Sequence, residues 1–313
     1  MTDTARLQEI GRKLCGSREG QFQVSTHELS GGRANRGIFL HNLTGPCEIN
    51  IVEKLSLSAG EKIFYEKYYR ELVSNAPGLA PKLFHCRPTD KGCVRILMEY
   101  LPTDGGIRPT AGSLRSLAKG IAAISRLHLR RWFFDSNSLR IGADAVEEFA
   151  ERCRNSNAIQ AAWELKTLDS LSTNLGRLNE ITRRFQVVWC HNDLKPEHIL
   201  PRSESSSGSR ICLVDWGMFS PNFPGADFHF LASSSLKEGR HEKSVRALIR
   251  EYCKAMSNTK LSVRREDAYF AAFYFSLKQN IRWFNHFGNP AFMRNGLRAA
   301  RCLCEQDSRW GRF

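Results

Sequence analysis

The sequence lacks the cysteine spacing of a metal site, although it contains ten cysteines among 313 residues. It has no Cys-x-x-Cys pair, and the closest two thiols are Cys302 and Cys304. Paired cysteines at that spacing are typical of zinc sites, whereas dense disulfides are typical of short secreted domains. We therefore expect no structural zinc site, and we expect the thiols to be reduced and mostly buried.

Long apolar runs are also missing. No stretch reaches the roughly 18 uncharged apolar residues that a membrane span needs. Residues 1–14 mix acidic and basic side chains and lack the apolar core of a secretion signal. These absences predict a cytoplasmic protein with no transmembrane segment. The composition is that of a globular protein, and the length suffices for one large domain or two lobes.

Acidic side chains are few relative to basic ones, 32 against 46, so the net charge is +14. Such a charge attracts nucleic acid, an anionic membrane surface, or an acidic or phosphorylated substrate. The basic residues are spread along the chain, however, and the local clusters are only pairs, Arg183–Arg184 and Arg264–Arg265. No aromatic/basic nucleic-acid motif accompanies them. We interpret the charge as general surface basicity that suits an anionic small-molecule acceptor; a nucleic-acid binder is an alternative that rests on charge alone.

The hydrophobic pattern divides the chain into a β-rich first part and a helical second part. After residue 102, apolar residues recur every three or four positions, which is typical of amphipathic helices. Aromatic residues gather at 269–284, and we interpret them as core rather than as a cage for a quaternary ammonium group. In the first part, strands are expected at residues 22–29, 37–42, 48–54 and 94–100, and a helix at 59–74.

Two polar clusters, each next to an apolar strand, carry the candidate chemistry. The first runs from Trp189 to Leu200 and the second from Leu213 to Gly217. They place Asp193 and Asp215 on opposite sides of a predicted hairpin. Phosphoryl transfer needs two such carboxylates: one orients or deprotonates the attacking hydroxyl, and the other holds Mg²⁺ on the phosphate oxygens.

These clusters resemble the catalytic loop and the Asp-Phe-Gly element of protein kinases. The string Asp-Leu-Lys-Pro-Glu at 193–197 is identical to the common kinase form, and Asp-Trp-Gly at 215–217 stands in place of Asp-Phe-Gly. The Asp-Trp-Gly version and the short chain look more like the aminoglycoside phosphotransferase and choline kinase superfamily. This resemblance implies an α+β, two-lobe protein-kinase-like fold. Its small, antiparallel, β-rich N-lobe would span residues 1–101, and its larger, mostly helical C-lobe residues 102–313.

The first hundred residues carry further matches in the expected order. Leu29 to Gly37 contains Gly-Gly followed by a small residue and Asn, similar to the superfamily's nucleotide loop. Lys54 looks like the strand lysine that binds the α- and β-phosphates. Leu97 to Pro102 resembles the hinge on which adenine rests. The resemblance thus assigns to the nucleotide Gly31, Gly32, Asn35, Lys54, Glu61, Glu99 and Leu101.

For some of these residues the resemblance also implies which group makes the contact. Glu61 would form an ion pair with Lys54, and Glu66 is the alternative partner. Glu99 and Leu101 would contact adenine through backbone groups, so their side chains carry little information.

In the second cluster the resemblance makes Asp193 the catalytic base or hydroxyl-orienting group. Lys195 would contact the transferred phosphate, and Asp215 would be the main metal ligand. His191 is expected to bury its ring and to be structural. The segment Pro224–Phe228 resembles the aspartate-bearing segment that follows the metal loop in these kinases.

His198 departs from the usual pattern, which has Asn as the ligand of a second metal position. Mg²⁺ prefers oxygen ligands, whereas Mn²⁺ accepts imidazole more readily. We therefore expect Mg²⁺, with Mn²⁺ as the alternative, and His198 as a metal ligand beside Asp215.

The function that follows is transfer of the γ-phosphate of ATP, or of GTP as the alternative, to a hydroxyl of a small molecule. Candidate acceptors are an antibiotic, an amino alcohol, or a sugar or glycolipid. A protein Ser/Thr kinase is one alternative, favoured by the Asp-Leu-Lys-Pro-Glu string but lacking an Ala-Pro-Glu triplet after Asp215. A catalytically weak pseudokinase that serves as an ATP-binding interaction module is another, motivated by His198.

Overall fold

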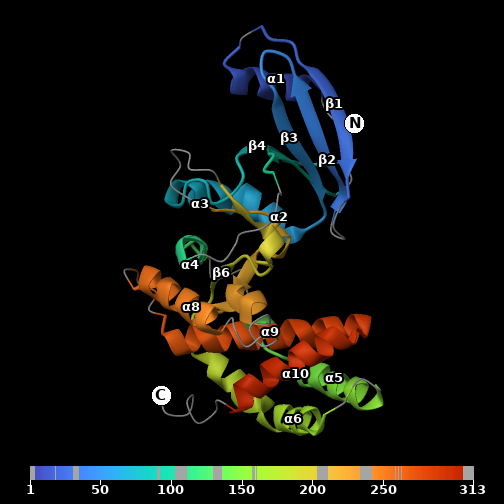
Figure 1. Cartoon of the computed structure of the whole chain (residues 1–313), viewed down its shortest axis with the longest axis vertical. Helices are drawn as coiled ribbons and strands as arrows, with labels where there is room; N and C mark the ends of the chain where they lie inside the picture. The colour runs from blue at the N-terminus through green and yellow to red at the C-terminus, as the bar shows by residue number, and fades with distance from the viewer. Residues whose placement is uncertain are drawn as a thin grey trace. The chain divides into compact units, whose positions relative to one another are not determined.

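The chain forms two compact units in the computed structural model. The first comprises residues 1–108 and 196–219, and the second residues 109–195 and 220–313. The first unit thus takes in residues 196–219, which lie beyond the sequence-based boundary at residue 101. Figure 1 labels many of the elements of both units. The structure describes residues 4–17, 19–30, 35–89, 92–102, 111–129, 136–156, 159, 161–202, 211–232, 242–257, 259, 261 and 263–305.

The first unit is built on a five-stranded antiparallel sheet (Figure 1). The four expected strands are confirmed, each within two residues of its expected ends, and β4 is an additional edge strand. Since β3 lies in the middle of the sheet, its side chains are flanked by strands on both sides. The strand order is β1 (Gln23–Leu29), β2 (Asn35–Thr44), β3 (Ile49–Ser56), β5 (Val94–Glu99) and β4 (Leu83–Pro88).

Helix α1 (Thr4–Cys15), which is an addition to the expected elements, packs on this sheet. Leu7 and Ile10, one helical turn apart, are buried with Leu43 and Ile51 of the sheet. Leu7, Ile10 and Leu14 recur at helical spacing, so the segment has the amphipathic pattern of a surface helix.

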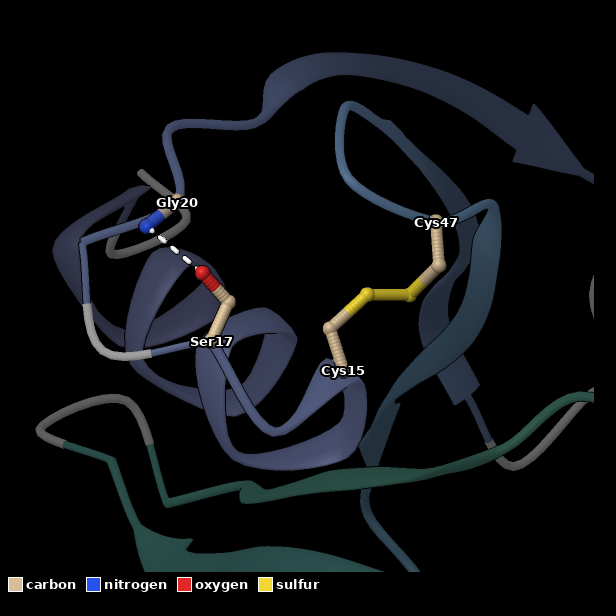
Figure 2. The surroundings of a disulfide bond; sticks show 4 residues. All are labelled: Cys15, Ser17, Gly20 and Cys47. Atoms are coloured by element: carbon tan, nitrogen blue, oxygen red, sulfur yellow. Dashed lines mark hydrogen bonds between the residues drawn. A yellow bond between two sulfur atoms is a disulfide. The ribbon is translucent and has the colours of Figure 1, made fainter.

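A disulfide joins the end of α1 to the turn between β2 and β3. Figure 2 shows Cys15 and Cys47 bonded, and next to them the Ser17 hydroxyl, which accepts a hydrogen bond from the Gly20 amide at 3.0 Å. The prediction that all thiols are reduced is therefore wrong for this pair. Thirty-two positions separate the two cysteines in the sequence, and only the packing of α1 brings them together. The other eight cysteines are not disulfide-bonded.

The expected helix at residues 59–74 is confirmed as a helical stretch with a π-helical middle. It consists of α2 (Ala59–Ile63), the π-helix η1 (Phe64–Tyr68) and α3 (Tyr69–Asn75). The Ser58 hydroxyl caps α2 by accepting hydrogen bonds from the amides of Gly60 and Glu61. A hairpin completes the unit, formed by β7 (Ile199–Pro201) and β8 (Ile211–Leu213), with the 3-10 turns η4 (Pro196–His198) and η5 (Trp216–Met218) at its ends.

The second unit is mainly helical. A strand pair, β6 (Val188–Cys190) with β9 (Ser220–Asn222), lies among the helices, and the 3-10 turns η3 (Ser136–Leu139) and η6 (Ala226–Phe228) connect elements. Among the residues that the structure describes, no helix is both long and apolar enough to cross a membrane. The long helices are α4 (Ala111–Ser125), α5 (Ala143–Asn155), α6 (Ala162–Arg183), α8 (Glu242–Met256), α9 (Arg265–Phe287) and α10 (Pro290–Glu305).

Helix α9 forms the core of the second unit. Its aromatic residues are buried along most of its length, from Tyr269 to Phe284, and they pack against the preceding turns and helices. Phe270, for example, contacts Phe185, and Tyr274 contacts Phe223. The interpretation of the aromatic stretch as core is confirmed except at Trp283, which is partly exposed. Together the two units give the expected α+β architecture, a β-sheet part followed by a helical part.

Candidate active site

Lys54 lies between two carboxylates in the first unit. Its Nζ is 2.7 Å from Glu61 Oε1 and 2.8 Å from Asp215 Oδ1. Burial alone would lower the pKa of Lys54, but the two carboxylates outweigh it and hold that pKa above its ordinary value. Glu61 is the partner that the geometry selects, because Glu66 is exposed on η1. Lys54 therefore carries a fixed positive charge at the middle strand of the sheet.

Serine and glycine residues at the start of α2 hold the loop that carries Asp215. The Ser58 hydroxyl donates a hydrogen bond of 2.5 Å to the carbonyl oxygen of Gly217. A Cβ at Gly60 would lie 2.5 Å from the same oxygen, so only glycine allows this approach. We refer to Asp215–Gly217 as the Asp-Trp-Gly loop. Its position is fixed from the helix that also carries Glu61.

The tryptophan of this loop is a packing residue. Trp216 is fully buried, and its ring lies parallel to the ring of Phe64 with centroids 3.7 Å apart. Its indole N–H donates to the carbonyl oxygen of Leu213 at 3.1 Å. The stacked pair anchors the loop against η1, and Asp215 is thereby held next to Lys54.

Asp215 has a left-handed backbone conformation with φ of 61°. A non-glycine residue in this region is strained, and such residues cluster at functional sites. The side chain is 41% exposed, with Oδ2 lying 3.5 Å from Nε2 of His198. Two donor atoms at that separation can both lie about 2.1 Å from one ion. The carboxylate and the imidazole thus fit a divalent metal ion, with a nitrogen where the family pattern has an amide.

Among the other residues that are expected to bind the nucleotide, Gly31 and Gly32 lie outside the described residues. Asn35 opens β2 opposite Ser56, and its Oδ1 is buried without a hydrogen-bond partner among the residues that the structure describes. Leu101 follows the end of β5 and is partly buried.

The side chain of Glu99 is structural. Its carboxylate accepts a hydrogen bond from the Lys82 amide at 3.0 Å and pairs with the guanidinium of Arg202. Arg202 in turn donates to the carbonyl oxygen of Gly78 at 2.8 Å. The backbone amide of Glu99 is also used, because it donates to the carbonyl oxygen of Lys82 at 2.9 Å.

In the second unit, the loop before Asp193 is held by a buried carboxylate. Asp227 accepts backbone hydrogen bonds from His191 at 3.1 Å and from Asn192 at 2.6 Å. Burial raises the pKa of Asp227 to about 6, and these two amides partly offset the rise. The ring of His191 is buried, as expected. Asp227 was not among the predicted site residues, although the segment around it matched the family.

Asn192 braces the same loop from the other side. It has a left-handed backbone with φ of 64°, and its side-chain amide donates to the backbone oxygen and the hydroxyl of Ser220 at 3.0 and 2.9 Å. Its own Oδ1 accepts from Asn222 at 2.7 Å. These contacts fix the backbone that presents Asp193.

Asp193 and Lys195 form a contact within the second unit. Lys195 Nζ lies 3.3 Å from Asp193 Oδ1, with the two side chains 35% and 18% exposed. The ammonium group also lies 5.5 Å from the centre of the Phe230 ring. Pro196 follows Lys195 directly, so the chain passes here from the second unit to the first.

Comparisons with known proteins give one family match and a set of solved structures with a similar fold. The family model for the phosphotransferase enzyme family (APH) matches residues 26–265. Solved structures with a similar fold include aminoglycoside 2′-phosphotransferase-IIIa in complex with GDP, with a TM-score of 0.58, 13% identity, and coverage of 96% of this chain and 99% of the other.

Two further structures represent other acceptors. Spectinomycin phosphotransferase in complex with ADP and spectinomycin has a TM-score of 0.59 and 12% identity, covering 96% of this chain and 98% of the other. Choline kinase from Cryptosporidium parvum has a TM-score of 0.54 and 17% identity, covering 98% and 96%. No curated protein matches the sequence significantly. At these identities the structural likeness establishes the protein-kinase-like fold.

Proposed function

Because the chain belongs to the phosphotransferase enzyme family (APH), we propose that it transfers the γ-phosphate of ATP to a hydroxyl group of a small molecule. The observation that carries this proposal is the position of Lys54 between Glu61 and Asp215. A charged lysine beside a carboxylate suited to a metal ion is the arrangement that phosphoryl transfer needs, since both neutralise charge on the phosphates.

We assign the nucleotide roles to the first unit. Lys54 binds the α- and β-phosphates, and Glu61 keeps its ammonium group charged and oriented. Gly31, Gly32 and Asn35 form the phosphate loop. The backbone groups of Glu99 and Leu101 contact the base. The Glu99 amide already donates to Lys82, so of its backbone groups only the carbonyl oxygen is assigned to this role.

We assign the acceptor roles to the second unit. Asp193 orients the acceptor hydroxyl and receives its proton, and Lys195 stabilises charge on the transferred phosphate. Asp227, His191 and Asn192 keep the backbone of Asp193 fixed, which is a positioning role. Preorganised groups of this kind lower the barrier because they need no rearrangement during the reaction.

Asp215 and His198 are the proposed metal ligands. A divalent ion held there would supply charge neutralisation on the phosphate oxygens. We propose Mg²⁺ as the ordinary ion and Mn²⁺ as the ion that the His198 imidazole favours. The complexes of the similar enzymes with ADP and GDP support a purine nucleotide here, with ATP proposed first and GTP as the alternative.

The net charge of +14 favours an anionic or neutral acceptor, such as a sugar derivative, over a polycationic one. We also propose a cytoplasmic location, which the eight cysteines outside the disulfide favour.

The test is a screen of hydroxylated acceptors with γ-labelled ATP and γ-labelled GTP. We expect acceptor-dependent formation of a labelled small-molecule product by the wild type and almost none by Asp193→Asn. Equal nucleotide turnover by both proteins would overturn the proposal in favour of a binding module. Label transfer to a peptide array without any small-molecule product would favour a protein kinase.

A further inference from the structure

The second unit contains a pocket of about 520 Å³ that none of the proposed catalytic residues lines. It lies where the C-terminal half of α9 meets the start of α5. Its described lining includes the basic residues Arg140, Lys278, Arg282 and His286. The pocket lies within one unit, so its shape does not depend on the rest of the chain.

The lining of this pocket carries more positive than negative charge. Among the residues that are described as lining it, the only acidic side chain is that of Glu148. Its carboxylate is already used: Oε1 lies 3.0 Å from Arg152 Nε, and Oε2 accepts from Asn285 at 3.2 Å. The three arginine and lysine side chains therefore face the pocket with little local compensation.

Two of these basic side chains use only some of their hydrogen-bond donors within the described part of the chain. The Nε of Arg140 is buried and has no hydrogen-bond partner within the described part of the chain, although Nη1 donates to Asn137 at 2.5 Å. Lys278 Nζ donates to the carbonyl oxygen of Ser138 at 2.5 Å, which uses one of the three N–H groups of an ammonium. Burial and the nearby charge of Arg282 lower the pKa of Lys278 to about 8. An anion in the pocket would relieve both the unmet donor and the repulsion between the cations.

The pocket also has an apolar side. Ile141 and Ile281 are buried in its lining, and the ring of Trp283 is partly exposed there. The guanidinium of Arg282 lies 5.6 Å from the centre of that ring. A ligand with an anionic group and a flat apolar portion would therefore meet complementary surfaces at both ends.

We propose that this pocket binds a small phosphomonoester, with its phosphate at Arg140, Lys278 and Arg282 and its apolar portion at Trp283. A phosphate dianion accepts several hydrogen bonds at once, and guanidinium groups match its geometry. The proposal does not depend on the nucleotide or the acceptor of the phosphotransferase reaction.

The test is calorimetric titration with phenyl phosphate and, separately, with inorganic phosphate. We expect phenyl phosphate to bind the wild type, and Lys278→Gln and Arg282→Gln each to weaken that binding by about tenfold or more. Inorganic phosphate should bind more weakly because it has no apolar portion. Lys166→Gln, the same charge change at an exposed position of α6, is the matched control and should bind like the wild type.

Arg282 is exposed, so its replacement tests the pocket without disturbing the core. Unchanged binding in Lys278→Gln and Arg282→Gln would overturn the proposal, as would an equal loss in the Lys166→Gln control. Equal affinity for the two probes would overturn the assignment of the apolar portion to Trp283.

A second measurement tests directly whether phenyl phosphate binds at Lys278. At pH 8 a lysine with a pKa of about 8 is half neutral and reacts with an acetylating reagent, and mass spectrometry measures the extent at each lysine. We expect phenyl phosphate to slow acetylation of Lys278 severalfold and to leave Lys166 unaffected. Equal acetylation of Lys278 with and without phenyl phosphate would overturn the proposal.

Discussion

The backbone of Gly60 lies so close to the carbonyl oxygen of Gly217 that a Cβ at position 60 would come within 2.5 Å of it. The same turn of α2 carries Glu61, and the Asp-Trp-Gly loop carries Asp215. Helix α2 and the Asp-Trp-Gly loop are therefore in direct contact at the backbone of Gly60. This contact sets the distance between the carboxylates of Glu61 and Asp215, which flank Lys54.

Gly60→Ala should therefore push the Asp-Trp-Gly loop away from α2. We expect a loss of about 1–3 kcal/mol in the free energy of unfolding, as for other overpacked sites, and a larger fractional loss of phosphotransferase activity. Urea unfolding and steady-state kinetics measure the two effects. Gly176→Ala is the control, because position 176 lies in α6 with no atom within 4 Å of the added Cβ. That variant should be more stable by about 0.5–1 kcal/mol, and an equal loss in both variants would contradict the role of the contact.

A second prediction concerns the buried pair of Lys54 and Glu61. Lys54→Met would leave the carboxylate of Glu61, which is 1% exposed, without its charge partner. Removing one member of such a pair costs about 3–5 kcal/mol in stability. The double variant Lys54→Met/Glu61→Gln should regain part of that loss, because no uncompensated buried charge remains; the carboxylate of Asp215, the other partner of Lys54, is 41% exposed. Urea unfolding of the single and double variants measures the coupling, and strictly additive losses would show that the two side chains act independently.

The sequence predicted the parts of the site that are local in the chain. The strand of Lys54, the helix of Glu61 and the loops of Asp193 and Asp215 all follow from short motifs next to apolar runs. Even there, helical spacing left Glu61 and Glu66 as alternatives. The folded structure decides between them, because Glu61 is buried 2.7 Å from Lys54 and Glu66 is exposed.

Contacts between distant segments could not be predicted. The disulfide between Cys15 and Cys47 depends on where α1 packs on the sheet, which its amphipathic pattern does not specify. The pairing of Glu99 with Arg202 depends on a hairpin that returns to the sheet. Asp227 matched a family segment, but its bonds to the backbone of the Asp193 loop become visible only when β6 and β9 are paired.

A third prediction tests Asp193 as the hydroxyl-orienting group. Asp193→Asn should lower kcat about 10²–10⁴-fold, the usual contribution of a general base. The side chain is 18% exposed and pairs with Lys195, so the thermal midpoint of the variant is measured as well, to separate lost turnover from lost folding. Asp169→Asn makes the same charge change at a 72% exposed position and should leave kcat unaltered. Equal turnover by the wild type and Asp193→Asn would support the pseudokinase alternative.

A fourth prediction concerns the metal preference. His198→Asn replaces an imidazole nitrogen, 3.5 Å from Asp215, by an amide oxygen. We expect the Mn²⁺ concentration for half-maximal activity to rise about tenfold, and that for Mg²⁺ to rise less or to fall. Activity titrated with each ion gives both values. His27→Asn, at an exposed position of β1, is the control, and an unchanged ratio of Mn²⁺ to Mg²⁺ activity in His198→Asn would remove His198 from the metal site.

The last prediction follows from the buried carboxyl of Asp227. Its pKa in the folded protein, about 6, lies above the ordinary value of 3.8, so the folded protein holds this proton more tightly than the unfolded chain does. The stability that the proton contributes is fully present below about pH 4 and is lost as the pH rises through about 6, a loss of about 3 kcal/mol. Asp227→Asn cannot titrate. The stability of the wild type relative to this variant should therefore fall between pH 4 and pH 7, as measured by urea unfolding at several pH values. As a control, the stability of the wild type relative to Asp169→Asn should show no such fall. If the stability of the wild type relative to Asp227→Asn stays flat or rises with pH, the amides of His191 and Asn192 outweigh burial at this carboxyl.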